Sequence, residues 1–496
     1  MQAATVLLAE GLKVRDPWPG WPPFETVIGL EVHVELATAS KMFCRCSARF
    51  GGEPNAQVCP VCAALPGALP VPNREAVEYA IKIGLALGCR VGDNTRFDRK
   101  NYFYPDLPKA YQISQYDRPL AEGGYLEVEG KRIRIRRVHM EEDAGKLIHA
   151  EAGGGSMVDL NRAGVPLVEI VTEPDLSSPG EARAFLQQLR TTLAYLDVSD
   201  LRLEEGSMRC DANLSLRPKG SSAFGTRSEV KNLNSFRAVE RALGYEEQRQ
   251  GQVLGDGGKV VQETRHWSEA EGITLPLRSK EEANDYRYFP DPDLLPLSIP
   301  PAWVEKVRAE LPEGPKERLR RLVEKDGLPP YDADFIVSSP EMASFYDRCL
   351  ALYPQPKNIT NWLMGEVSRL LNLASCTLAE AKVGPEGLAE LLTMVDQGMI
   401  NGVTAKTVLE EMFRSGAGAS GIVAKKGLAQ ISDAGKLETA IGEVLAANPK
   451  AVADFRGGKT GAMGFLVGQV MKVTRGQGNP ETVNRLLKDK LEGVDG

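Results

Sequence analysis

The sequence predicts an α+β protein, in which an antiparallel-sheet cradle domain is followed by all-α helical and tail domains. The first observation is that short segments before residue 296 alternate apolar and polar side chains, as strands with one packed face do. The second is that the chain from about residue 300 onward has the apolar spacing of helices. The third is size: 496 residues, 42% hydrophobic and 26% charged, suit roughly three globular domains and exclude a small binding module.

Proline and glycine mark the expected domain borders. Pro296, Pro300 and Pro301 interrupt regular structure, and the small residues from Gly416 to Gly421 interrupt the helical period. We therefore expect an amino-terminal extension rich in Pro and Trp, a cradle domain with a cysteine-rich loop, a helical domain and a tail domain, over residues 1–23, 24–296, 297–420 and 421–496.

Three segments of the cradle domain have the alternation of strands. In residues 26–36 the apolar side chains face one way, and the other side carries Gly29, Glu31, His33 and Glu35. In residues 207–217 the same alternation puts Asp211 on the polar side. In residues 227–231 it groups Glu229 and Lys231, and a helix follows with Phe236, Val239 and Leu243 inward. The polar side of this sheet is where we expect the chemistry.

Charge and apolar content restrict the environment of the protein. Lys and Arg number 60 against 67 Asp and Glu, so the net charge of −7 requires any nucleic-acid contact to come from local basic faces. Every apolar run is shorter than the roughly 18 residues of a membrane-spanning helix, so we expect no membrane contact. The first residues lack the basic region of a signal peptide, and half of the cysteines are scattered, so we expect a cytoplasmic protein.

Four of the eight cysteines form one cluster. Cys44 and Cys46 make one pair, Cys59 and Cys62 the other, and a glycine-containing loop joins the pairs. Four thiolates complete a tetrahedral Zn²⁺ site and leave no open position for catalysis. We expect a structural zinc ion, and the alternative is four free thiols.

Acidic residues and histidines accompany the predicted strands. Glu31 and His33 share one face, and the segment after the basic run 131–137 supplies His139, Glu141, Glu142 and Asp143. Carboxylates on one face repel each other unless a cation lies among them, so a divalent ion is expected. Mg²⁺ prefers oxygen ligands, so a histidine ligand keeps Mn²⁺ possible. The alternative is an ordinary solvated face.

Aromatic and basic residues are interleaved from Arg99 to Asp117, where Lys100 and Lys109 lie among Tyr102 and other aromatic residues. Such a segment suits stacking on a base or sugar while a cation holds a phosphate. A loop folded over its own tyrosines is equally compatible. The arginines of the run 131–137 suit either an RNA backbone or a soluble sheet edge.

From about Phe24 to the carboxyl terminus the sequence closely resembles the B subunits of the bacterial aspartyl/glutamyl-tRNA amidotransferases. The resemblance rests on VIGLEVHVEL, SKMFC with CPVC, FDRKNYFYPDLPKAYQISQYD, HMEEDAGK, NRAGVPLVEIVTEPD, EEGSMRCDAN, SEVKNLNSF and DYRYFPDPDL. In the last part, QISD, NPKAV and VGQVMKVTRGQGNP resemble the tail domain of the family. The extension before Phe24, Ala110 and the string MINGVTAK depart from the family pattern.

The resemblance implies a glutamine-synthetase-like cradle and a two-step reaction. ATP would phosphorylate the side-chain carboxylate of Glu-tRNA(Gln), of Asp-tRNA(Asn) or of both, and ammonia would then displace phosphate. The implied catalytic residues are Glu31, His33, Glu141, Glu142, Asp211 and Glu229. Those implied to bind Mg²⁺ are Glu31, His33, Glu142, Asp211 and Glu229, and those implied to bind ATP are Lys100, Tyr102 and Lys231.

The resemblance also implies partners. The sequence has neither a nucleophilic Cys beside a His nor a GGSSGG-like amidase loop, so a glutaminase A subunit would supply ammonia, with a small C subunit completing a heterotrimer. In the tail domain, Lys459, Lys472 and Arg475 are candidate contacts to tRNA phosphates. Two alternatives are a non-catalytic, zinc-stapled tRNA-binding scaffold and a ligase that acts on a free small carboxylic acid.

Overall fold

The computed structural model describes residues 24–149, 155–203, 205–279, 286–429, 434–459, 461–474 and 478–493. Its contacts divide the chain into two compact units, residues 1–314 and 315–496. The division follows helix α4 (Pro301–Ala309), whose Val307 is buried in the amino-terminal core. The expected extension over residues 1–23 and the expected tRNA contact Arg475 lie outside the described residues.

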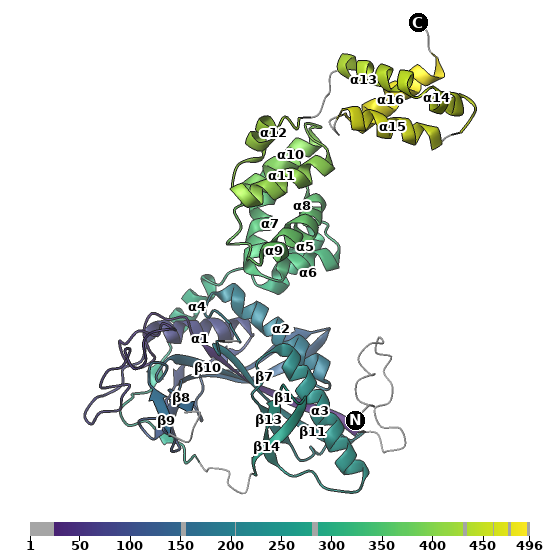
Figure 1. Cartoon of the computed structure of the whole chain (residues 1–496). Coiled ribbons are helices and arrows are strands. Elements are labelled where there is room, and N and C mark those ends of the chain that lie inside the picture. The colour runs from purple at the N-terminus through teal and green to yellow at the C-terminus, as the bar shows by residue number, and fades with distance from the viewer. Residues whose placement is uncertain are drawn as a thin grey trace. The chain divides into compact units, whose positions relative to one another are not determined.

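The amino-terminal unit is built on a nine-stranded sheet with the spatial order β14, β13, β12, β11, β1, β10, β7, β6 and β2 (Figure 1). Neighbouring strands pair antiparallel, as expected, except β12 and β13. Helix α3 (Phe236–Gly255) joins these two, because parallel neighbours need a crossover connection. The strands are β1 (Phe24–Glu35), β2 (Arg90–Val91), β6 (Ala121–Val128), β7 (Lys131–Glu142), β10 (Pro166–Thr172), β11 (Met208–Pro218), β12 (Ser228–Lys231), β13 (Glu263–Ser268) and β14 (Ile273–Ser279).

Shorter strands form three small sheets beside the large one. A three-stranded sheet has the order β15, β4 and β5, and two pairs join β16 to β3 and β8 to β9. Their bounds are β3 (Asn94–Thr95), β4 (Asp98–Asn101), β5 (Tyr111–Ser114), β8 (Lys146–His149), β9 (Ser156–Asp159), β15 (Phe289–Pro290) and β16 (Leu297–Ser298). Strand β4 carries Lys100, so this small sheet brings the aromatic and basic segment to the large sheet.

Helices α1 (Arg74–Ala86), α2 (Pro179–Leu196) and α3 cover one face of the large sheet (Figure 1). Each begins at a polar side chain that accepts hydrogen bonds from the first turn, namely Asn73, Ser178 and Ser235. The alternation expected in β1 and β11 is confirmed, since the apolar side chains of both strands are buried under the helices. Val239 and Leu243 of α3 are buried as expected, and Phe236 is half-buried.

The core under these helices predicts a large difference between two leucine substitutions. Leu186 of α2 is fully buried, whereas Leu295 is 85% exposed. We expect Leu186→Ala to lower the free energy of unfolding of the amino-terminal unit by about 2–5 kcal/mol, because it removes buried methyl groups and leaves a cavity. Leu295→Ala should change it by less than about 0.5 kcal/mol. Urea unfolding followed by circular dichroism measures both, and equal midpoints would contradict this core assignment.

The carboxy-terminal unit is helical, as expected. Most of its helices begin at a proline, whose fixed φ suits the first helical position. Helices α13 to α16 enclose a core of their own, which includes Leu437, Ile441, Leu466 and Leu487. The helices are α5 (Pro315–Glu324), α6 (Pro330–Val337), α7 (Pro340–Leu352), α8 (Pro356–Trp362), α9 (Ser368–Ala374) after a π-helical turn (Leu363–Val367), α10 (Pro385–Asp396), α11 (Gly402–Ser415), α12 (Ala419–Lys426), α13 (Ala434–Ala447), α14 (Pro449–Arg456), α15 (Gly461–Val473) and α16 (Pro480–Glu492). Over the described ranges, none of the helices combines the length and the apolar character needed to cross a membrane.

Candidate active site

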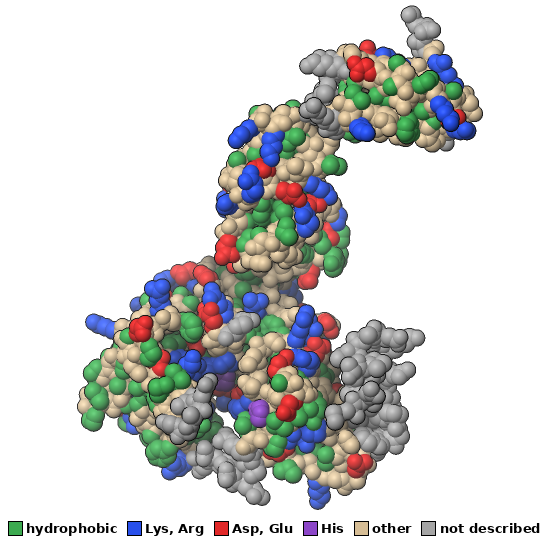
Figure 2. All heavy atoms as spheres, in the orientation of Figure 1, with side chains coloured by type: hydrophobic (Ala, Val, Ile, Leu, Met, Phe, Trp, Pro, Cys, Tyr) green, Lys and Arg blue, Asp and Glu red, His purple; other side chains and the backbone are tan. Residues whose placement is uncertain are grey.

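The face of the large sheet that is turned away from α1, α2 and α3 carries polar side chains. Strand β1 presents Glu31 and His33 there, and Asp211 of β11 is the backbone partner of Glu31. His33 pairs with Glu169 of β10, which in turn pairs with His139 of β7. Figure 2 shows basic and histidine side chains in a hollow of this unit. Strand register therefore brings residues that are far apart in the sequence into adjacent rows.

His33, Glu141 and Glu169 converge on one point of this polar face. His33 Nε2 lies 3.5 Å from Glu141 Oε1 and 3.6 Å from Glu169 Oε2. One ligand atom from each residue lies within 4.8 Å of the other two. Both carboxylates are buried and His33 is half-buried, so a cation bound here would be largely shielded from solvent. Two carboxylates and an imidazole suit a divalent ion, with the imidazole favouring Mn²⁺ over Mg²⁺.

His139 extends this group. Its Nε2 lies 3.1 Å from Glu169 Oε2 and 4.0 Å from Glu141 Oε2. Burial alone would raise the pKa of Glu169, but the imidazoles of His139 and His33, together with the Lys100 ammonium, lower it well below its usual range. Glu169 is therefore a carboxylate. The Nδ1 atom of His139 is buried and has no hydrogen-bond partner among the described residues.

Glu31, Asp211 and Glu229 lie beside this group on the same face. Burial, followed by the charges of Glu169, Glu229 and Asp211, raises the pKa of Glu31, as expected where carboxylates gather without a cation. Lys231 already neutralises part of this charge, since its Nζ lies 2.6 Å from Asp211 Oδ2 and 3.2 Å from Glu229 Oε1. A cation that took both carboxylates as ligands would have to displace this ammonium.

Lys100 approaches the same group from strand β4, inside a cage of tyrosines. Its Nζ lies 5.1 Å from the ring centre of Tyr286 and 6.0 Å from that of Tyr102. Tyr288 completes the cage and stacks on Tyr116 at 4.3 Å between ring centres. Burial would lower the pKa of Lys100, but the nearby Glu141 and Glu169 raise it overall, so the side chain is a cation.

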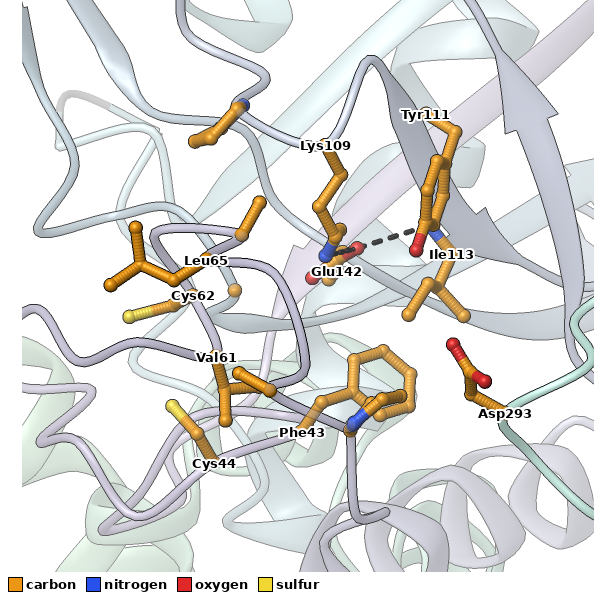
Figure 3. A pocket seen from close by; sticks show the side chains of 15 residues that line it. Phe43, Cys44, Val61, Cys62, Leu65, Lys109, Tyr111, Ile113, Glu142 and Asp293 are labelled. Atoms are coloured by element: carbon orange, nitrogen blue, oxygen red, sulfur yellow. Dashed lines mark hydrogen bonds and ion pairs between the residues drawn. The ribbon is translucent and has the colours of Figure 1, made fainter.

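Glu142 lies in a different place from Glu141. Consecutive residues of a strand point to opposite faces, and Glu142 lines a cavity of about 220 Å³ with Lys109, Tyr111 and Asp293 (Figure 3). Its carboxylate is ion-paired with Lys109 and accepts a hydrogen bond from the Ile113 N–H at 3.0 Å. Among the described residues, the group that includes His33 and Glu141 therefore takes Glu169, and not Glu142, as its third member.

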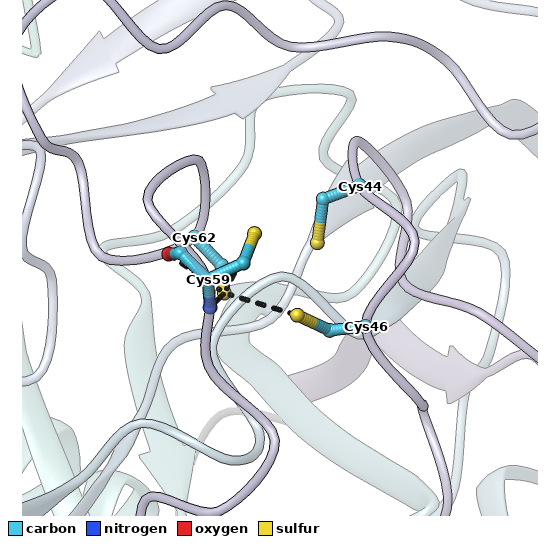
Figure 4. A group of neighbouring side chains, drawn as sticks. All are labelled: Cys44, Cys46, Cys59 and Cys62. Carbon is cyan, nitrogen blue, oxygen red and sulfur yellow. Dashed lines mark hydrogen bonds between the residues drawn. The ribbon is translucent and has the colours of Figure 1, made fainter.

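The four cysteines of the loop converge as the spacing predicts. Figure 4 shows the side chains of Cys44, Cys46, Cys59 and Cys62 turned toward one another. Cys62 Sγ lies 3.9 Å from Cys59 Sγ and 4.0 Å from Cys46 Sγ. A tetrahedral zinc site with Zn–S bonds of about 2.3 Å needs S–S separations of about 3.8 Å, whereas a disulfide needs about 2.05 Å. The geometry fits one metal ion with four thiolate ligands.

Comparison with known proteins identifies the family of the chain. Residues 26–305 match the family model described as the GatB/GatE catalytic domain, and residues 344–491 match the one described as the GatB domain. A relative from Moorella thermoacetica, named as the B subunit of an aspartyl/glutamyl-tRNA(Asn/Gln) amidotransferase, is 60% identical over 94% of this chain and 100% of its own length. This chain belongs to that amidotransferase family. Relatives of the same name from Carboxydothermus hydrogenoformans and Geobacter sp. are 55% and 53% identical, over 94% and 95% of this chain and 99% and 100% of their own lengths.

This member of the amidotransferase family has a buried lysine beside its cysteine cluster. Lys41 is fully buried, and its Nζ donates to the Leu160 carbonyl at 3.1 Å and lies 3.6 Å from Cys62 Sγ. The Cys44 thiol, against the effect of burial, lowers the pKa of Cys62 to about 4, and the Lys41 ammonium adds to this. A buried ammonium needs an anionic partner, and a metal-bound thiolate supplies one.

Two residues at the centre of this candidate site are not among those that the resemblance implied. They are Glu169 and His139, although both lie in segments that carry the family resemblance. Glu169 is the single charged residue of the apolar strand β10, where burying a carboxylate requires a partner. That interruption of an apolar run is the signal in the sequence that could have identified Glu169.

Proposed function

We propose that this chain uses ATP to activate the side-chain carboxylate of Glu-tRNA(Gln), of Asp-tRNA(Asn) or of both, for conversion to the amide. The observation that carries the proposal is the convergence of His33, Glu141 and Glu169 on the polar face of the sheet, in a chain that belongs to the amidotransferase family. A divalent cation held there, Mg²⁺ or Mn²⁺, would neutralise phosphate oxygens and align the terminal phosphate of ATP.

The chemistry proceeds in two displacements. An oxygen of the side-chain carboxylate attacks the γ-phosphorus, the bond from that phosphorus to the β,γ-bridging oxygen breaks, and ADP leaves. Ammonia then attacks the carbonyl carbon, phosphate departs with the carbon–oxygen bonding pair, and the new ammonium group loses one proton to become the amide. Activation is needed because a free carboxylate repels nucleophiles and lacks a good leaving group.

The residues around the cluster have distinct proposed roles. Lys100 would contact phosphate oxygens, since it is a cation that faces Glu141 and Glu169 within its tyrosine cage, which includes Tyr102. Glu31, Asp211 and Glu229 would bind a second cation, which would displace the Lys231 ammonium from the two carboxylates that it contacts. The displaced Lys231 ammonium would then contact ATP. Glu142 would act from the separate cavity that it lines.

We also propose the partners and cofactors that this reaction requires. A glutaminase A subunit would release the ammonia, a small C subunit would complete a cytoplasmic heterotrimer, and the four cysteines would hold structural Zn²⁺. The names of the relatives, which are those of a subunit, support an assembly of several chains.

Of the two lysines of the tail domain, we propose that Lys472 contributes more to tRNA binding than Lys459. Lys472 is exposed and has no ion pair among the described residues, whereas Lys459 Nζ lies 2.9 Å from Asp454 Oδ1. We expect Lys472→Gln to weaken tRNA binding and to reduce the slope of log K against log salt by about one, because one phosphate contact is lost. Lys459→Gln should have a smaller effect. Filter binding across a salt series measures both slopes, and an unchanged slope in Lys472→Gln would contradict the assignment.

The reaction itself is tested with the complete assembly. We mix the chain with its partner subunits, glutamine and Glu-tRNA, with or without ATP, and measure the amounts of ADP and Gln-tRNA that form. We expect both products to form in equal amounts and to depend on all components. If His33→Ala leaves product formation and tRNA binding intact, the chain is a tRNA-binding scaffold instead. If ADP forms with free glutamate and no tRNA, the chain is a ligase for small carboxylic acids.

A further inference from the structure

Strand β7 contains a bulge that changes which side chains face the site. Thr172 of β10 pairs with Ile135 and the adjacent Val171 pairs with Arg137, so Arg136 is an extra residue in β7. Before the bulge the odd-numbered Ile133 and Ile135 are buried in the core, and after it Val138 and Met140 are.

The bulge therefore puts Arg137 on the same face as His139 and Glu141. A regular strand would have pointed Arg137 into the core beside Ile135. Arg137 is paired across the sheet with Val171, which is paired with Glu31. The next paired positions on the same face are those of His139, Glu169 and His33. Bulges often redirect a side chain toward an active site, so the bulge in β7 indicates a functional role for Arg137.

Arg137 has no protein partner that explains this placement. Its side chain makes no hydrogen bond or ion pair with any described residue, and its Nε is buried. By contrast, Arg134 on the same strand is ion-paired with Asp175 at 2.6 Å. A buried guanidinium N–H without an acceptor is costly, and the cost is removed when an anion binds.

Lys100 is a second cation without an ion pair in the described part of the chain. Its Nζ lies 5.1 Å from the ring centre of Tyr286, and that ring centre lies 6.1 Å from the ring centre of Tyr288. Burial raises the pKa of Tyr288 to about 12, and the positive charges of Lys100 and Arg137 both act to lower it, in agreement with both cations lying on the side of the sheet that holds the carboxylate and histidine cluster.

We propose that Arg137 and Lys100 form an oxyanion-binding pair that takes an oxyanion of the reactants, either the terminal phosphate of ATP or the side-chain carboxylate of the aminoacyl group. The planar guanidinium of Arg137 presents two parallel N–H donors, which match two oxygens of either group. This inference rests on the proposed function, and it adds a residue that positions the reacting oxygens relative to the cluster.

The test compares Arg137→Gln with Arg136→Gln in the complete assembly. Arg136 is adjacent and exposed, so its substitution removes the same charge without touching the site. We expect Arg137→Gln to lower kcat/KM by about 10- to 100-fold, as the loss of charge-assisted hydrogen bonds does, and Arg136→Gln to change it less than about twofold. A higher KM for ATP identifies the phosphate as the ligand, and a higher KM for Glu-tRNA identifies the carboxylate.

Equal kinetics for the two variants would overturn the inference. If Arg137→Gln is not folded by circular dichroism, Arg137→Lys is used instead, because it keeps the charge and loses the paired donors. A folded Arg137→Lys with a kcat/KM at least about tenfold lower supports the pair, and an unchanged value contradicts it. His33→Ala serves as the reference: if it is inactive while Arg137→Gln is normal, only the oxyanion-binding pair fails.

Discussion

Glu169→Gln should abolish amide formation almost completely while leaving the protein folded and able to bind tRNA. The substitution keeps the size of the side chain but removes the negative charge that His33 and His139 contact. A neutral amide is a poor ligand for a divalent ion, so the cation would be lost or misplaced. We expect kcat to fall by about three orders of magnitude, which corresponds to about 4 kcal/mol of transition-state stabilisation at about 1.36 kcal/mol per tenfold change.

The measurement is ATP-dependent Gln-tRNA formation by the assembled enzyme, with Mn²⁺ binding to the full chain followed by electron paramagnetic resonance. Glu129→Gln is the matched control, because Glu129 is exposed in the turn that joins β6 to β7 of the same sheet and has no ion pair among the described residues. The control should match the unmodified enzyme in both assays. Near-normal activity of Glu169→Gln, or Mn²⁺ binding that is unchanged, would show that the cluster is not the cation site.

Local patterns in the sequence were sufficient to predict some of the strands that form the site, β1, β11 and β12 among them, but not β10, which carries Glu169. The two-residue period put Glu31, His33 and Asp211 on the polar sides of β1 and β11, where the structure has them. The same period places the consecutive residues Glu141 and Glu142 on opposite faces, and it is Glu141 that lies beside His33. A period within one strand is a local property, so it is visible without the fold.

Which polar side chains meet depends on the pairing of distant strands, and a single sequence does not contain that register. Glu169 reaches His33 only because β10 pairs with β1, and Arg137 reaches the same face only because an extra residue is inserted in β7. A bulge shifts the alternation by one residue, so the pattern of the run 131–137 gave no indication of it. The same pairing of strands sets the neighbours of Lys231, which the resemblance implied as an ATP-binding residue: its ammonium contacts the carboxylates of Asp211 and Glu229.

Cys62→Ser should cause the cysteine cluster to lose its metal ion. The Cys62 sulfur makes more contacts in the cluster than one thiolate pair would require. It lies near the sulfurs of Cys46 and Cys59, 3.2 Å from the Cys59 backbone nitrogen, and near the Lys41 ammonium. Replacing its thiolate by a hydroxyl leaves three sulfur ligands and a buried ammonium without an anion. We expect zinc content to fall from about one ion per chain to a small fraction of that, since structural zinc requires all four ligands.

Cys376→Ser is the matched control, because Cys376 is a half-buried thiol in the other compact unit and outside the cluster. Two measurements compare the variants: zinc content by mass spectrometry of the metal, and resistance to protease between residues 44 and 62. Cys376→Ser should match the unmodified chain in both, whereas Cys62→Ser should be cleaved in this segment.

Lys41→Met separates the contribution of the ammonium from that of the thiolates. The four thiolates remain, so the ion should still bind. It should bind more weakly, because a Zn²⁺ ion with four thiolates carries excess negative charge that Lys41 offsets. Full zinc content in Cys62→Ser would mean that the four sulfurs converge for packing alone, and tighter zinc binding in Lys41→Met would mean that the buried ammonium opposes the metal.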